Sequence, residues 1–80
     1  MAVSQINRLV KMAEQIARNL GAGHDDDIAR EKTADHLRRF WTPAMRRQLQ
    51  DFRGRGGQVS AVVAAALAAL AAAEGEGDNN

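Results

Sequence analysis

Apolar residues recur every three or four positions along most of the chain, which is the spacing of one face of an α-helix. Capping residues, glycines and a proline divide this pattern into four stretches. The expected helices cover about residues 4–20, 27–41, 43–53 and 61–73. Ser4 and Ser60 are suited to cap the first and the fourth helix. The pattern therefore predicts an all-α fold, a small bundle of three to four short helices in a single domain over residues 1–73, with a disordered acidic tail over residues 74–80.

Each predicted helix has an apolar stripe that we expect to face the core. The stripe of the first helix is Ile6, Leu9, Val10, Met12, Ala13, Ile16, Ala17 and Leu20. Those of the second and third helices are Ala29, Thr33, Leu37, Phe40 and Trp41, and then Met45, Leu49 and Phe52. The fourth helix carries no charge and is rich in alanine, with a narrow stripe of Val63, Leu67 and Leu70. It is either the central helix of the domain or a docking helix for another protein.

The most informative segment is residues 36–47, which we call the arginine corner. Thr42 is a good N-cap and Pro43 suits the first position of a helix, so the segment predicts a tight helix–turn–helix corner. Its aromatic residues are expected inside. Its arginines are expected outside, and they are Arg38, Arg39, Arg46 and Arg47.

Asp35 lies three and four residues before Arg38 and Arg39. Exposed ion pairs along the helix are therefore expected for these two arginines. The same account leaves Arg46 and Arg47 unexplained.

Composition limits the size of the core and the class of function. The chain has 80 residues, of which 45% are hydrophobic, but 16 of these are alanine. A domain this small is marginally stable alone, so a partner surface is the expected source of further stability. The formal net charge of +1 argues against a general nucleic-acid binder, although residues 36–55 carry six arginines and one acid. The absence of cysteine excludes a disulfide scaffold and a thiol nucleophile.

Several other features have simple structural interpretations. The run over residues 24–27, His-Asp-Asp-Asp, is either a hard-metal site or a helix cap, and its spacing, unlike that of a calcium loop, favours the cap. His36 has no second ligand at helical spacing and is interpreted as a packed side chain. The glycines within residues 54–57 are interpreted as a flexible linker rather than a phosphate loop. No nucleophile–base pair emerges, so we do not expect an enzyme by itself. No secretory signal is visible, and the fourth helix is too short and alanine-rich to cross a membrane, so a cytosolic protein is expected.

Three parts of the chain resemble the delta subunit of cytosolic NAD-dependent, molybdenum-containing formate dehydrogenases. They are residues 9–17 (LVKMAEQIA), residues 36–49 (HLRRFWTPAMRRQL) and the Gly56-Gly57 break before an apolar helix. The resemblance covers about residues 4–70. Family members usually carry Asp before the proline and Arg after it, where this chain has Thr42 and Ala44.

This resemblance implies a non-catalytic accessory subunit of a complex that oxidises formate and passes electrons through iron–sulfur clusters and flavin to NAD. The chain is not expected to hold molybdopterin, flavin or clusters. Its implied role is to stabilise the complex or to assist cofactor insertion into the large molybdopterin-containing catalytic subunit. The iron–sulfur and flavin subunits are the other implied partners.

We therefore expect the arginine corner to bind the large subunit, because Trp and Arg often anchor interfaces. The candidate partner-binding residues are Arg38, Arg39, Trp41, Met45, Arg46 and Arg47. Simple core packing remains the alternative for Phe40 and Trp41. Two other functions stay open. One is a helical nucleic-acid-binding module that uses the same arginines, and the other is a metal or cofactor chaperone that uses His24, His36 and the aspartates.

Overall fold

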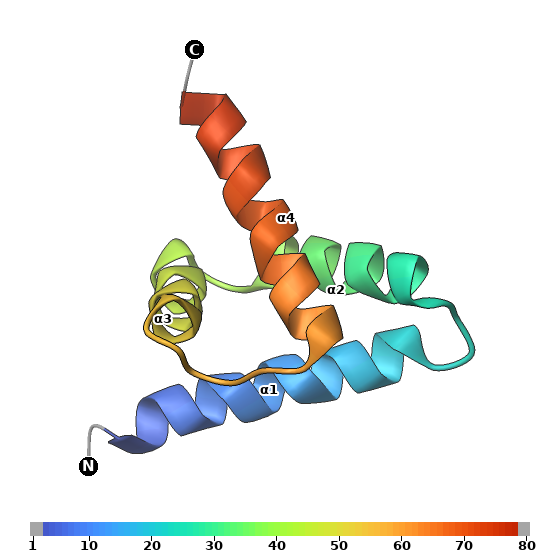
Figure 1. Ribbon diagram of the computed structural model, residues 1–80, viewed down its shortest axis with the longest axis horizontal. Helices are drawn as coiled ribbons and strands as arrows, with labels where there is room; N and C mark the ends of the chain where they lie inside the picture. Colours follow the sequence, from blue (N-terminus) through green and yellow to red (C-terminus); the bar gives the residue numbers. More distant parts are fainter. Residues whose placement is uncertain (1–2, 79–80) are drawn as a thin grey trace.

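A computed structural model of the chain describes the backbone of residues 3–78 and the side chains of residues 5–73. Within this range it has four helices and no strand, which confirms the predicted all-α class. The helices are α1 (Val3–Gly21), α2 (Asp26–Phe40), α3 (Pro43–Gly54) and α4 (Ala61–Asp78). Figure 1 shows α1 and α2 as an antiparallel pair, with α3 at one end of the pair and α4 crossing it.

Three helices begin where the sequence places a capping residue. The side-chain oxygens of Asp25, Thr42 and Ser60 each accept a hydrogen bond from the backbone N–H three residues later, at 3.0, 3.1 and 3.3 Å respectively. Each bond satisfies one of the N–H groups that a helix start leaves unpaired. The prediction for Ser4 is wrong, because α1 already begins at Val3 and Ser4 lies inside the helix.

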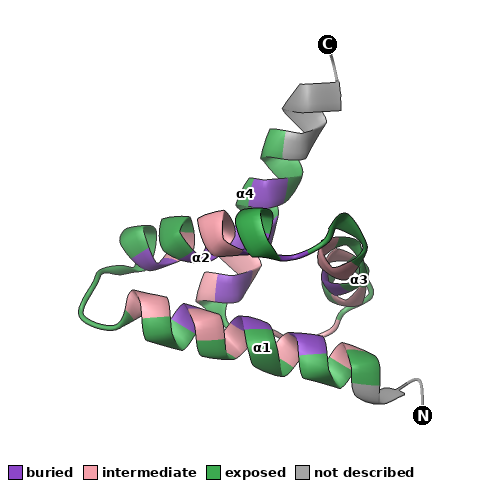
Figure 2. Ribbon diagram, turned by 180° about the vertical axis from the view of Figure 1, so that it is seen from behind, coloured by how far each residue is buried: buried purple, intermediate pink, exposed green. Residues whose placement is uncertain are grey.

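The core lies where one face of α1 meets the other three helices. Figure 2 shows its buried positions along the side of α1 that faces them. The buried hydrophobic cluster consists of Leu9, Ala13, Ala17, Leu37, Trp41, Leu49, Val63, Leu67 and Leu70. Most of the predicted stripes are therefore confirmed. Met12 is an exception, with 37% of its surface exposed.

Small side chains allow the helices to approach one another closely. Ala66 of α4 is fully buried, and Ala29 of α2 is almost so. At the end of α1, a Cβ atom added to Gly21 would lie 2.8 Å from the Cβ of Ala29, closer than two carbon atoms tolerate. The first half of α4 is thus part of the core, where Val63, Ala66 and Leu67 are fully buried.

Beyond Leu70 the helix α4 leaves the bundle. Residues 71–73 are exposed, and Figure 1 shows the end of α4 projecting away from the other helices. The backbone of α4 is helical to Asp78, while the side chains of residues 74–78 lie outside the described residues. The disorder expected for residues 74–80 therefore stays a prediction. Asn79 and Asn80 lie outside the described residues.

The glycines after α3 form a defined helix cap. Gly56 adopts a φ of 94°, a conformation that favours glycine, and its N–H donates to the carbonyl of Arg53 at 3.0 Å. The N–H of Gly57 donates to the carbonyl of Phe52 at 2.9 Å. These two bonds make a Schellman motif. The segment was predicted to be a flexible linker, but its backbone is held by the end of α3.

Candidate functional site

The arginine corner is built around an extended two-residue turn between α2 and α3. Trp41 has φ −92° and ψ 143°, and Thr42 has φ −69° and ψ 156°. Proline disfavours the helical conformation of the residue before it, so α2 must end ahead of Pro43. The Thr42 cap and Pro43 then start α3 at once. The predicted helix–turn–helix corner is confirmed.

The two aromatic residues at the end of α2 have opposite environments. Trp41 is 6% exposed and belongs to the core, as its core-packing interpretation expected. Phe40 is 69% exposed, so the prediction that it faces the core is wrong. The reason is the turn, because the extended backbone at Trp41 directs the indole inward while the last helical residue stays outside. The Phe40 ring lies near the His36 ring, with centroids 4.7 Å apart and a 45° angle between the ring planes.

Two arginines of the corner share one carboxylate on α2. Arg38 donates a hydrogen bond to Asp35 at 2.6 Å, and Arg39 pairs with its other oxygen at 3.2 Å. The hydrogen bond from Arg38 lowers the pKa of the Asp35 carboxyl group below its usual range, and the charge of Arg39 lowers it further. The predicted ion pairs are confirmed. Both guanidinium groups remain largely exposed, since the side chains of Arg38 and Arg39 are 61% and 65% accessible.

Arg46 has a structural role that the sequence did not reveal. Its guanidinium donates to the carbonyl oxygen of Arg38 at 3.3 Å, which satisfies one of the free carbonyls at the end of α2. Its Nε atom is buried and has no hydrogen-bond partner among the described residues. Arg47 is exposed on the next position of α3. The two arginines therefore differ, since Arg46 holds the corner together while Arg47 faces solvent.

The remaining candidate at the corner is Met45, which is half-buried and packs against the core. The corner as a whole presents Phe40 with the guanidinium groups of Arg38, Arg39 and Arg47 to solvent. Exposed guanidinium groups bind carboxylates and phosphates through several N–H donors each. The surface can thus recognise an anionic partner.

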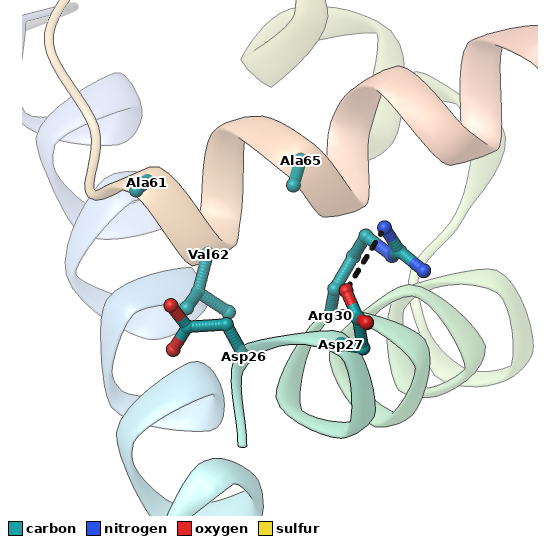
Figure 3. A pocket seen from close by; sticks show the side chains of 6 residues that line it. All are labelled: Asp26, Asp27, Arg30, Ala61, Val62 and Ala65. Atoms are coloured by element: carbon teal, nitrogen blue, oxygen red, sulfur yellow. Dashed lines mark ion pairs between the residues drawn. The ribbon is translucent and has the colours of Figure 1, made fainter.

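Asp25 caps α2, and Asp26 and Asp27 in its first turn line a small pocket. Asp25 caps the helix through Ile28, and Asp27 pairs with Arg30 at 3.6 Å. Figure 3 shows Asp26 and Asp27 on one side of a pocket of about 190 Å³, with the first turns of α4 on the other. Within the described residues no three His, Asp or Glu side chains come close enough to hold a metal ion. The helix-cap interpretation of this run is confirmed.

In the part of the chain that the structure describes, no helix combines the length and apolar character needed to span a membrane.

Comparison with known proteins gives one family. Residues 8–67 match the model of the family described as "NADH-dependant formate dehydrogenase delta subunit FdsD". No curated protein and no solved structure gives a significant match. The matched residues make up more than half of the chain and contain the whole arginine corner. The chain therefore belongs to the FdsD family, the delta subunits of NADH-dependent formate dehydrogenase.

Proposed function

We propose that this chain is a non-catalytic accessory subunit that docks on the molybdopterin-containing catalytic subunit of formate dehydrogenase through its arginine corner. There it stabilises the complex or assists insertion of the molybdenum cofactor. Family membership supports the proposal, because a delta subunit implies partner subunits. We propose that the iron–sulfur and flavin subunits are among these partners. The proposed place of action is the cytoplasm. In this role the chain itself holds no molybdopterin, flavin or cluster.

The observation that carries the proposal is the exposure of three guanidinium groups at the arginine corner. Each guanidinium group has five N–H donors, and the carboxylate that Arg38 and Arg39 share occupies only part of their capacity. Arg47 adds a third exposed cation. Arg46 links α3 to the end of α2 through the carbonyl oxygen of Arg38, so the exposed guanidinium groups share one corner of the fold, where they can bind carboxylates of a partner.

The small core also supports the proposal that the chain works bound to a partner. Much of α4 contributes alanine, which buries little surface, so the free chain gains little stability from it. Binding of a partner to the folded chain shifts the folding equilibrium toward the folded state. Docking on a large subunit is therefore a means of stabilising both proteins.

The proposal is tested by reversing exposed charges at the corner. Arg39→Glu with Arg47→Glu places like charges against the acidic partner, and we expect the catalytic subunit to be lost when the tagged chain is purified. Arg46 is left unchanged because its replacement would also disturb the end of α2. The matched control reverses two exposed charges on α1, Arg8→Glu with Lys11→Glu, and should retain the complex. Undiminished recovery of the catalytic subunit with the corner variant would contradict the proposal. Salt-sensitive binding of the wild-type chain to random duplex DNA, without the enzyme, would favour the nucleic-acid module instead.

A further inference from the structure

Phe40 is the most exposed large hydrophobic residue among the described side chains. It is 69% accessible, against 40% for Ile28 and 37% for Met12, the two others that are exposed. A phenylalanine can bury 150 Å² or more in a contact, roughly the area range of aromatic residues in cores and interfaces. Its own chain covers only a minor part of this surface.

The position of Phe40 is one that the helix pattern assigns to the apolar face of α2. It follows the buried Thr33 and Leu37 at spacings of seven and three residues. The other helices bury the apolar face of α2 as far as Leu37, but they leave its last turn, with Phe40, exposed. The His36 ring lies beside the Phe40 ring, with a centroid distance of 4.7 Å. Most of the Phe40 side chain remains open to solvent and to a partner.

Several arginines belong to the same corner of the fold as this aromatic side chain. Arg38 and Arg39 belong to the same last turn of α2, and Arg46 reaches that turn from α3. From Asp35 to Arg47 the chain carries four arginines and a single acid. Interface centres are enriched in aromatic residues and arginine, and the charge around an apolar anchor determines which partner it accepts.

We infer that Phe40 is the apolar anchor of the arginine corner and inserts into an apolar pocket rimmed by carboxylates on a partner subunit of formate dehydrogenase. This inference rests on the proposed docking function. A protein surface fits better than a nucleic acid, since the whole chain has a formal charge of only +1.

The test measures binding of the full-length chain to formate dehydrogenase complex purified from a strain that lacks the delta chain. We expect Phe40→Ala to weaken the Kd by about 30-fold or more, the change typical of an interface hot spot. Phe40→Leu should weaken it less, because an apolar side chain remains. Ile28→Ala, the matched control at the other end of α2, should leave the Kd within about twofold, as expected for a residue outside the interface. The free Phe40→Ala chain should keep its helical circular dichroism spectrum and its urea midpoint, because most of the removed side chain is exposed.

The ratio of the variant Kd to the wild-type Kd separates the anchor from the surrounding charge. This ratio should stay constant between low and high salt for Phe40→Ala, while the effect of Arg39→Glu with Arg47→Glu should shrink with salt. If Phe40→Ala binds with wild-type affinity while the arginine variant binds weakly, Phe40 is not the anchor, but the proposed docking function is retained. A wild-type chain that does not bind the complex would overturn both. Tight binding to a single-stranded oligonucleotide that is lost in Phe40→Ala would also contradict the inference, because the ring would then stack on bases.

Discussion

A carboxylate oxygen of Glu14 accepts a hydrogen bond from the backbone N–H of Ser60 at 2.7 Å. The bond joins the middle of α1 to the residue that caps α4, although 46 residues separate the two along the chain. The Ser60 hydroxyl in turn accepts from the N–H of Val63. The start of α4 is therefore held by its own cap and by α1.

Removal of the Glu14 carboxylate should loosen the start of α4. We expect Glu14→Ala to lower the free energy of unfolding by about 1 kcal/mol, the usual net value of a hydrogen bond, because the N–H of Ser60 loses its acceptor. Gln15→Ala removes an exposed neighbour on the same helix and should change the free energy of unfolding by less than about 0.5 kcal/mol. Urea unfolding followed by circular dichroism measures both. Equal midpoints for the two variants would show that the contact contributes nothing.

Two glycines near the end of α3 should respond in opposite directions to the same substitution. A Cβ at Gly57 would lie 2.4 Å from the Phe52 ring, so Gly57→Ala should cost about 1–3 kcal/mol as the ring is displaced from its packed position. A Cβ at Gly54 meets open space inside the helix, so Gly54→Ala should stabilise the chain by about 0.5–1 kcal/mol. Thermal unfolding of both variants provides the measurement. A stable Gly57→Ala chain would mean that the ring does not depend on this cap.

The shared carboxylate of Asp35 should make stability depend on pH in the acid range. The hydrogen bond from Arg38 lowers its pKa in the folded chain. A lowered pKa contributes stability that is present above the ordinary carboxyl pKa of about 4 and is lost as the pH falls through the folded value. We therefore expect Asp35→Asn to be less stable than wild type at neutral pH, with a difference that shrinks below about pH 4.

The prediction is tested by measuring the urea midpoints of the wild-type and Asp35→Asn chains at several pH values between neutral and strongly acid. Because the pair is exposed, 1 M salt should reduce the difference at every pH, and this serves as the control. A difference that is independent of pH would contradict the assignment of the ion pairs to Asp35.

The parts of the fold that depend on neighbouring residues were predictable from the sequence. Asp25, Thr42 and Ser60 cap helices through bonds that span three residues, and Pro43 excludes a continuous helix across the turn. The pairing of Asp35 with two arginines is also local, since one helical turn brings the groups together. Such features need no knowledge of the tertiary structure.

The errors concern features that tertiary contacts or the turn backbone decide. Periodicity assigned both Phe40 and Trp41 to the core, but the extended conformation of the turn buries only Trp41. The sequence places Arg46 with Arg47 among the outward-facing candidates for partner binding, but it does not reveal that Arg46 donates to a carbonyl eight residues earlier in the chain. The contact of Glu14 with Ser60 lies entirely outside the reach of local pattern analysis. An aromatic residue next to a turn that ends a helix is the signal that could have singled out Phe40.

Hydroxyl-radical footprinting of the chain, free and within the assembled formate dehydrogenase, tests the central claim most directly. The radicals oxidise exposed aromatic and methionine side chains, so Phe40 reports on the arginine corner and Met12 on the outer side of α1. The account predicts that Phe40 is oxidised in the free chain and protected in the complex, while Met12 is modified equally in both. Protection of Met12 with unchanged oxidation of Phe40 would show that the chain docks through a different surface and would contradict the account.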